Sequence, residues 1–263
     1  MLTAVKNQLK IWLLSIKYSI IRTMVNKKSF LFSVVLMFIS NASFLVQWIV
    51  ILSASNSTDI TMKHVLLVWG FCGGAVGLAN IFLGGVNSIP EYIIEGKLDA
   101  YIVQPKNILL SVASSRSGIS ALGDFIYGVV VVLIASPSIK TLILFLIFSI
   151  LGAICYASFI TIIYSLIFFS INLKELARVL SRISIAFGTY PDTIFSGGIK
   201  ILLYTLFPVG AMIYLPTWMI LKDNYMFLLL AFIYTIVITL IAFVIFYTGL
   251  KKYSSSNLMR ART

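Results

Sequence analysis

The sequence predicts an all-α polytopic membrane protein, and three observations lead to that fold class. The chain of 263 residues is 60% hydrophobic and only 11% charged, with a mean hydropathy of +1.04. Charged residues make up about a quarter of a typical soluble domain, so this composition excludes a soluble core. Apolar runs of about 20 residues, long enough for a transmembrane helix, recur along the chain. They lack the alternation that a transmembrane barrel strand shows over about ten residues.

Residues 1–28 are predicted to form an N-terminal amphipathic interfacial helix, ahead of a transmembrane domain at residues 29–263. Apolar residues recur there at steps of three and four: Val5, Leu9, Trp12, Ile16 and Ile20. Basic residues follow a neighbouring stripe: Lys6, Lys10 and Lys17. A continuous apolar face that carries a tryptophan beside lysines is typical of a helix lying at the headgroup boundary, so we expect lipid, not nucleic acid, as its partner.

Six transmembrane helices are expected. Five of them are continuous, at residues 29–53, 64–82, 117–135, 141–170 and 225–250. The sixth comes from residues 183–221, a stretch about twice as long as one crossing needs. It is interrupted at Gly188, Pro191, Gly197, Gly198, Pro208, Gly210 and Pro216. We therefore expect a helix followed by a broken or re-entrant element before the last helix, with the path of this stretch and the place of Lys200 left open.

Lysine and arginine counting predicts the orientation. Sixteen of the 20 basic residues fall on one side if both termini, residues 84–116 and residues 172–182 are cytoplasmic. Three fall on the other side: Lys63, Lys140 and Lys222. The positive-inside rule then places the N- and C-termini in the cytoplasm. Attraction between this basic rim and anionic lipid accounts for the net charge of +12.

Polar residues inside the predicted crossings are candidates for a transport pathway. Asn41, Ser43 and Gln47 lie in the first crossing, where they either bond to neighbouring helices or contact a substrate. Asp124 lies in the third crossing, as a structural anchor or as a functional contact. His64 opens the second crossing, and we expect an interfacial residue there. Glycines at small-residue spacing in the second crossing should admit a close helix partner: Gly70, Gly73, Gly74 and Gly77.

No catalytic motif is found, so the chain is not expected to be an enzyme. Its single histidine cannot build a Ser-His-Asp triad on the inner side, and there is no HExxH. The one Gly-Lys pair, Gly96-Lys97, is followed by Leu98, so it is not a phosphate-binding loop. The chain itself is expected to bind no cofactor and no metal. If it carries out energised transport, another polypeptide supplies the energy.

The polar stretch at residues 89–110, IPEYIIEGKLDAYIVQPKNILL, separates two apolar runs and is predicted to be cytoplasmic. Glu91, Glu95 and Asp99 follow one another at four-residue spacing, which would place three carboxylates on one face of a helix. We interpret this helix as a surface offered to a partner. The alternative is a solvated polar face balanced by Lys97.

Within this stretch, EGKLDAYIVQPKN resembles the connector of ABC-2 type exporter permeases. The closer likeness is to the bacterial branch with a G-x-L-D-x-Y-x-x-x-P-x-N signature. Six residues occupy its positions: Gly96, Leu98, Asp99, Tyr101, Pro105 and Asn107. The resemblance extends along nearly the whole chain in shape and spacing, although only this motif is specific.

The resemblance implies that residues 89–110 form a cytoplasmic coupling helix seated in a groove of a separate ABC ATPase subunit. ATP and Mg would then be bound by that partner. It also implies that two permease subunits, of the same or related chains, form one pathway in a bacterial inner membrane. The sparse charge inside the membrane favours an amphipathic cargo, such as a peptide antibiotic, a drug or a lipid-linked molecule.

Two other functions remain open from the sequence. One is an ATP-independent secondary transporter or channel, which usually needs intramembrane charges or repeated halves. Asp124 and Lys200 are the charges available for that role. The other is a membrane enzyme acting on lipids, which would need a cluster of reactive side chains at one membrane face.

Overall fold

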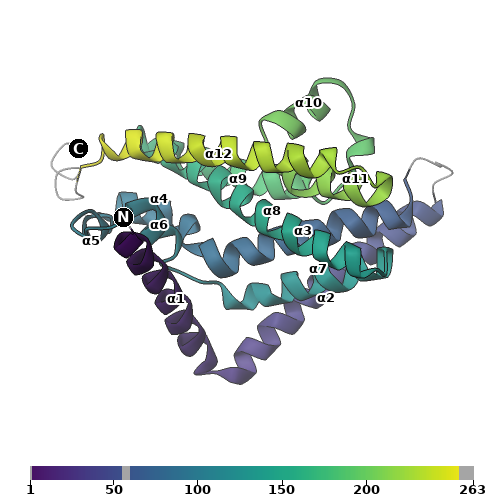
Figure 1. Ribbon diagram of the computed structural model, residues 1–263, viewed down its shortest axis with the longest axis horizontal. Coiled ribbons are helices and arrows are strands. Elements are labelled where there is room, and N and C mark those ends of the chain that lie inside the picture. The colour runs from purple at the N-terminus through teal and green to yellow at the C-terminus, as the bar shows by residue number, and fades with distance from the viewer. Residues whose placement is uncertain (1, 55–59, 255–263) are drawn as a thin grey trace.

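The computed structural model describes residues 2–54 and 60–254, and every regular element in those ranges is helical. Four helices are long and apolar enough to cross a membrane. They are α2 (Lys27–Ala54), α3 (Met62–Leu83), α8 (Ile139–Ser165) and α12 (Met226–Leu250), which extend along the long axis of the molecule (Figure 1). Their bounds agree with the predicted crossings to within a few residues. The prediction of a polytopic all-α fold is therefore confirmed.

The remaining two predicted crossings are less regular. The third contains η2 (Ile119–Ala121) and α7 (Leu122–Ala135), which together form a shorter apolar helix. The stretch before the last helix contains α10 (Gly197–Thr205), η6 (Gly210–Tyr214) and α11 (Leu215–Lys222). The two parts of this stretch are bent by 82°, which makes a broken span or a re-entrant loop and raises the possible number of spans to five. The predicted break before the last helix is present.

The start of that stretch differs from expectation. Residues 172–182 were expected to form a separate surface segment, with a new helix from residue 183. Instead, α9 (Lys174–Phe187) is one helix that includes both parts. Its buried residues are Ala177, Ser181 and Ser184, and Ser181 bonds to Tyr164 of α8. Leu176 and Val179 are each 50% exposed, and the Lys and Arg residues of α9 are exposed or half-buried. The polar and apolar residues of this stretch thus belong to two faces of one amphipathic helix. The prediction instead separated them into consecutive segments, with a boundary at residue 183.

The glycines of α3 make it the central helix of the bundle. A Cβ added to Gly73 would lie 2.8 Å from the carbonyl oxygen of Asp124, and one added to Gly77 would lie 2.8 Å from the backbone nitrogen of Phe125. Both contacts are with α7, so these glycines permit the close approach that the sequence predicts. Two thirds of the most apolar part of α3 is buried, whereas only 6% of the corresponding part of α2 is. Helix α2 therefore lies at the edge of the bundle.

Helix α1 (Leu2–Met24) crosses the ends of the long helices in Figure 1 and meets α2 at a sharp corner. Its start lies at the same end of the molecule as the short helices α4, α5 and α6 and the end of α12. That α1 lies along a membrane surface stays a prediction.

Candidate functional site: the connector between α3 and α7

The candidate site is the polar connector that follows α3. It contains η1 (Gly84–Ser88), α4 (Ile89–Ile94), α5 (Asp99–Ile102) and α6 (Ile108–Ala113). The apolar helix that begins at Met62 extends as far as Ile94 over 33 residues, with η1 and α4 following α3 without a loop. A Cβ on Gly85 would lie 1.9 Å from the carbonyl oxygen of Val112, so η1 packs directly on α6. The connector is therefore continuous with α3 at its start and packs on itself through α6.

The connector is not one helix, and the prediction of a single carboxylate face is wrong. Helix α4 ends at Ile94 and α5 begins at Asp99. Between them, Gly96 has a φ of +72°, a left-handed conformation that costs any residue with a Cβ about 1–2 kcal/mol. The turn separates Glu91, on α4, from Asp99, on α5. Four-residue spacing therefore does not bring these side chains to one face.

Most residues of the G-x-L-D-x-Y-x-x-x-P-x-N signature stabilise this bent shape. Leu98 is fully buried, and its backbone N–H donates to the carbonyl oxygen of Tyr92 at 3.3 Å. The ring of Tyr101 lies 5.5 Å from the ring of Tyr92, centroid to centroid. Asn107 caps α6 by accepting a hydrogen bond from the backbone N–H of Leu110 at 3.0 Å. Gly96, Leu98, Tyr101 and Asn107 thus determine the conformation of the connector.

An ion-pair cluster joins the two ends of the connector. Lys97 Nζ lies 2.7 Å from Glu91 Oε1 and 2.6 Å from Glu95 Oε2. Arg116 donates to both oxygens of Glu91, at 3.1 and 3.2 Å. Hydrogen bonds to Glu91 and Glu95 raise the pKa of Lys97 above its ordinary value. These groups are partly exposed, so each pair alone contributes little, but together they hold α4 against Arg116.

The tip of the connector, residues 99–105, is an exposed surface of mixed character. Asp99, Ala100, Gln104 and Pro105 are all exposed. Ile102 is 42% exposed and Val103 is 81% exposed. Ile102 and Val103 are neighbours in the chain, so they form a small exposed apolar patch among polar side chains. The sequence reasoning missed Ile102 and Val103, although the apolar pair between Tyr101 and Pro105 in an otherwise polar segment was a visible signal.

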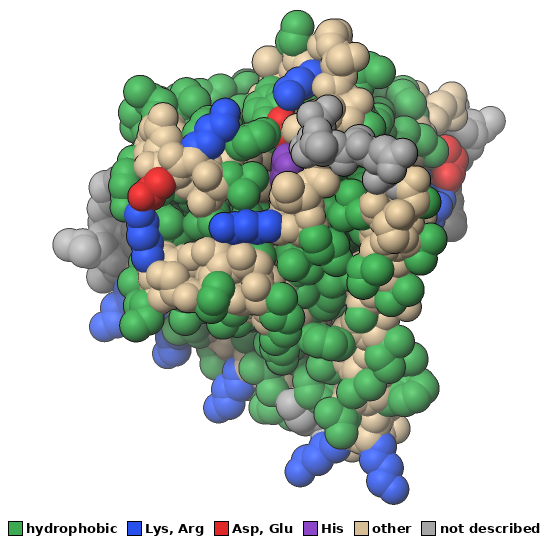
Figure 2. Space-filling view, turned by 90° about the vertical axis from the view of Figure 1, so that its right-hand side faces the viewer, with side chains coloured by type: hydrophobic (Ala, Val, Ile, Leu, Met, Phe, Trp, Pro, Cys, Tyr) green, Lys and Arg blue, Asp and Glu red, His purple; other side chains and the backbone are tan. Residues whose placement is uncertain are grey.

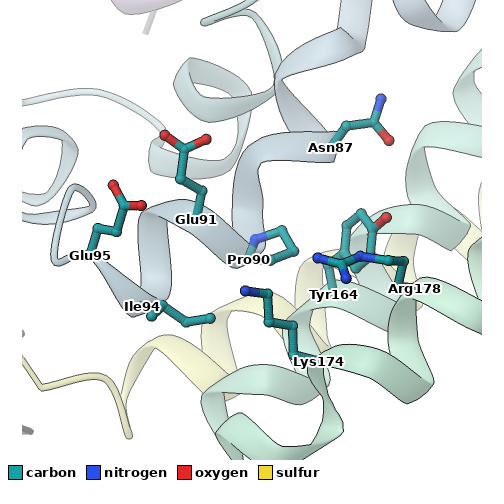
Figure 3. Close-up of a pocket in the computed structure, with 8 residues that line it drawn as sticks. All are labelled: Asn87, Pro90, Glu91, Ile94, Glu95, Tyr164, Lys174 and Arg178. Atoms are coloured by element: carbon teal, nitrogen blue, oxygen red, sulfur yellow. The ribbon is translucent and has the colours of Figure 1, made fainter.

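A cavity of about 210 Å³ lies between α4 and α9. Figure 3 shows Lys174 and Arg178 extending from α9 toward Pro90, on α4. The carboxylates of Glu91 and Glu95 turn away from these two cations in the same view, in keeping with their bonds to Lys97 and Arg116. Within the described residues, the two cations on its α9 wall form no ion pair with Glu91 or Glu95.

The family comparison is decisive once this geometry is known. The model of the ABC-2 family transporter proteins matches residues 37–257, which include the connector and all the long helices from α3 onward. The chain belongs to the ABC-2 transporter family. It is a multi-pass membrane protein of the permease type. A comparison with curated proteins gave no significant match, and neither did a comparison with solved structures.

The four pathway candidates of this ABC-2 protein divide into two pairs. Asn41 Nδ2 donates to Asp124 Oδ1 at 2.6 Å, so these two residues join α2 to α7. Ser43 donates to the carbonyl oxygen of Ile39, in its own helix, and Gln47 is exposed on the outward side of α2. Ser43 and Gln47 are exposed, whereas Asn41 and Asp124 are half-buried and bonded to each other.

A second polar cluster surrounds Asp192, a residue that the sequence reasoning missed. The Asp192 side chain is 2% exposed. It accepts a hydrogen bond from Tyr204 Oη at 2.8 Å and bonds from Trp218 Nε1 at 3.1 and 3.2 Å. Lys200 Nζ lies 3.2 Å away. Burial raises the pKa of Asp192, but the interactions with His64, Trp218, Tyr204 and Lys200 outweigh burial and hold this pKa well below its usual range.

Four elements of the ABC-2 protein meet at Asp192. Tyr204 and Lys200 come from α10, Trp218 comes from α11, and Asp192 itself lies in η5 (Asp192–Ile194). The fourth element is α3, because His64 Nε2 lies 3.5 Å from Asp192 Oδ1. His64 is buried in the first turn of α3, and its place at a membrane boundary stays a prediction. Figure 2 views this end of the molecule, where hydrophobic side chains dominate and a few basic ones stand out. The cluster holds the bent element against the start of α3.

Within residues 2–54 and 60–254, no three His, Cys, Asp or Glu side chains lie together in a way that could hold a metal ion. The two cysteines, Cys72 and Cys155, are buried and unpaired.

Proposed function

We propose that this protein is the permease subunit of an ATP-driven exporter. Two copies, or one copy and a related chain, would form the translocation pathway, and separate ABC ATPase subunits would supply the energy. Membership of the ABC-2 family supports this function at the level of the family. ATP and Mg would be bound by the ATPase, because the sequence offers no phosphate-binding loop of its own.

The exposed tip of the connector is the observation that carries this proposal. Asp99 presents a negative charge beside the apolar side chains of Ile102 and Val103, on a segment that continues from α3. A small apolar anchor that enters a pocket supplies most of the affinity of an interface, and a neighbouring charge selects the partner. Residues 99–105 therefore suit a groove on a soluble subunit. Glu91 and Glu95, engaged by Lys97, serve mainly to hold the tip in position.

Six crossings with both termini in the cytoplasm of a bacterial cell complete the proposal. The four long helices, the bent α10–α11 element and the shorter η2–α7 helix supply the six. Residues 119–135 are near the lower limit of about 17 residues for a span. The basic residues concentrate at the connector end, and the positive-inside rule places that end in the cytoplasm.

The pathway would lie between the two permease subunits, beside the outward face of α2. Ser43 and Gln47 are polar residues on that face of an otherwise apolar helix. A route with hydroxyl and amide groups and few charges suits an amphipathic cargo better than a small ion.

Co-purification tests the proposal. The chain is expressed with the candidate ATPase subunits of its own cell and purified in mild detergent. We expect an ATPase with a Walker A loop to copurify with the native chain and to be lost with Val103→Asp. Val25→Asp is the matched control, because Val25 is 84% exposed and lies outside the connector. Recovery of the ATPase with Val103→Asp at the native yield would contradict the docking site. Transport that continues without ATP would contradict the function.

A further inference from the structure

Helix α1 has a docked face that is half polar. Its half-buried residues recur at helical spacing, and three of the six are Gln or Ser: Gln8, Ile11, Trp12, Ser15, Ile16 and Ser19. Trp12 and Ile16 belong to the apolar stripe that the sequence assigned to lipid. In the structure they face the protein, whereas Leu9 and Ile20 of the same stripe are exposed. The face of α1 that contacts the protein is thus rotated, relative to the predicted apolar stripe, toward the uncharged polar residues.

Three side-chain hydrogen bonds fasten this docked face to the connector and its flanks. Gln8 Nε2 donates to Ser111 Oγ at 3.1 Å, on α6. Trp12 Nε1 donates to the carbonyl oxygen of Phe82 at 2.8 Å, near the end of α3, and the two rings lie 5.7 Å apart. Ser15 Oγ donates to the carbonyl oxygen of Ser114, just after α6. Helix α1 is therefore bonded to both ends of the connector: the end of α3 before it, and α6 at its close.

The opposite face of α1 is basic. At about 100° per residue, Lys6, Lys10 and Lys17 lie roughly 160–200° around the helix from Gln8. All three are exposed, and none of them is in an ion pair within the described part of the chain. The helix contains no acidic residue at all. Basic side chains also project along the lower margin of the molecule in Figure 2.

Large apolar side chains flank these lysines on the same outward face. Leu9 is 50% exposed, Leu13 is 62% exposed and Ile21 is 51% exposed. Apolar side chains interleaved with lysines match the lipid headgroup boundary, where alkyl groups enter the acyl region and ammonium groups stay at the phosphates. An acidic soluble protein could pair with the lysines, but it would not explain why large apolar side chains are exposed between them.

We propose that the Lys6–Lys10–Lys17 face of α1 binds anionic phospholipid headgroups and that this contact sets the position of the connector. Only two residues separate the end of α1 from the start of the apolar helix α2, which keeps α1 at the level of the membrane surface. Each bound headgroup draws α1 toward the membrane, and the hydrogen bonds of Gln8, Trp12 and Ser15 carry that restraint to α6 and to the end of α3. The anionic lipid content of the membrane thereby controls how freely the connector moves.

A fluorescent label on α1 tests the lipid contact without any ATPase. The full-length chain carries Leu13→Cys with an environment-sensitive dye, and the buried native cysteines leave this thiol as the reactive one. In phosphatidylcholine vesicles with a rising fraction of phosphatidylglycerol, we expect the emission to shift to shorter wavelength and added salt to reverse the shift. The triple variant Lys6→Gln, Lys10→Gln and Lys17→Gln should lose the shift.

A matched triple variant removes the same charge elsewhere at the connector end: Lys106→Gln, Lys251→Gln and Lys252→Gln. It should keep the shift. Absence of a phosphatidylglycerol dependence in the native chain would overturn the proposal, as would equal loss in both triple variants. A shift that appears only when a soluble subunit is added to phosphatidylcholine vesicles would also overturn it and would assign the face to a protein.

Hydrogen exchange tests the link to the connector. Amides of both α1 and α6 should become protected together when phosphatidylglycerol is present. In Gln8→Ala with Ser15→Ala, α1 should still respond to the lipid while α6 no longer does. If phosphatidylglycerol still protects the α6 amides to the native extent in this double variant, the restraint does not pass through these hydrogen bonds. Because neither readout depends on ATP hydrolysis or transport, a failure of either experiment would leave the proposed transport function untouched.

Discussion

Arg116 holds Glu91 with two hydrogen bonds, of 3.1 and 3.2 Å, and so joins the end of the connector to its first helix. Lys97 bonds the same carboxylate from the turn between α4 and α5. Glu91 is therefore the centre of an internal cluster, not a free charge for a partner. The exposed side chains beyond the turn, Asp99 to Pro105, are those available for recognition.

Replacing Glu91 by Gln should loosen α4. The variant loses the charge that holds Lys97 and Arg116, and pairs at such exposed sites have small effects. Local hydrogen exchange of the α4 amides should then rise a few-fold at most. Glu175→Gln is the control, because its ion pair with Arg178 lies within α9. Unchanged exchange in α4 would show that the cluster does not restrain it.

Replacing Gly96 by Ala should strain the turn of the connector. A Cβ at a φ of +72° costs about 1–2 kcal/mol, and limited proteolysis between α4 and α6 should become faster. Gly198→Ala is the matched control, because Gly198 lies inside α10 at negative φ and an added Cβ meets no atom within 4 Å. That variant should be neutral or slightly stabilising. Equal proteolysis of the two variants would contradict the assigned turn.

Replacing Asp192 by Asn should release the bent α10–α11 element. The buried carboxylate accepts bonds from Tyr204 and Trp218 and faces Lys200. An amide has one acceptor oxygen in place of two and no charge, so we expect a loss of about 1–3 kcal/mol. The thermal midpoint of the purified protein measures it. Asp223→Asn is the control, since Asp223 pairs with Lys140 at an exposed site. If Asp223→Asn lowered the thermal midpoint as much as Asp192→Asn, the burial of Asp192 would contribute nothing.

The stabilisation by Asp192 should depend on pH in a defined direction. The pKa of this carboxyl is depressed in the folded protein, so its contribution is fully present above the unfolded value of about 4 and is lost as pH falls toward the folded value. The difference in thermal midpoint between the native chain and Asp192→Asn should thus be constant from neutral pH to about pH 5. A difference that declines already between pH 7 and pH 5 would contradict the depressed pKa.

Replacing Asn41 by Leu should weaken the attachment of α2. The Asn41 amide is bonded to Asp124 across two helices, and such bonds contribute about 0.6 kcal/mol on average and at most about 1.7 kcal/mol inside membranes. Ser43→Ala should be nearly neutral, since that hydroxyl is satisfied within its own helix. Unfolding in mixed detergent micelles compares the two variants. A larger loss from Ser43→Ala would reverse this assignment.

The sequence was sufficient for the long helices because apolar length alone determines them. Helices α2, α3, α8 and α12 all lie close to the predicted ranges, and the glycines of α3 contact α7 as expected. The turn at Gly96 could not be predicted with the same certainty, since glycine is tolerated inside a helix at a cost of about 1 kcal/mol.

The Asp192 cluster escaped prediction for a different reason. His64 and Asp192 are far apart in the chain, and neither belongs to a motif. Their contact depends on the 82° bend that returns α11 to the start of α3. The tip at Val103 could have been suspected, because two large apolar residues lie between a tyrosine and a proline in a polar segment.

Photo-crosslinking from position 103 tests the central claim most directly. A photoreactive amino acid replaces Val103 in the full-length chain inside living cells, and Val25, which is similarly exposed, is replaced in a parallel strain. The account predicts that the nucleotide-binding subunit is captured from position 103 and not from position 25. Capture of that subunit from position 25 alone, or labelling of position 103 by a reagent confined to the outside of the cell, would contradict it.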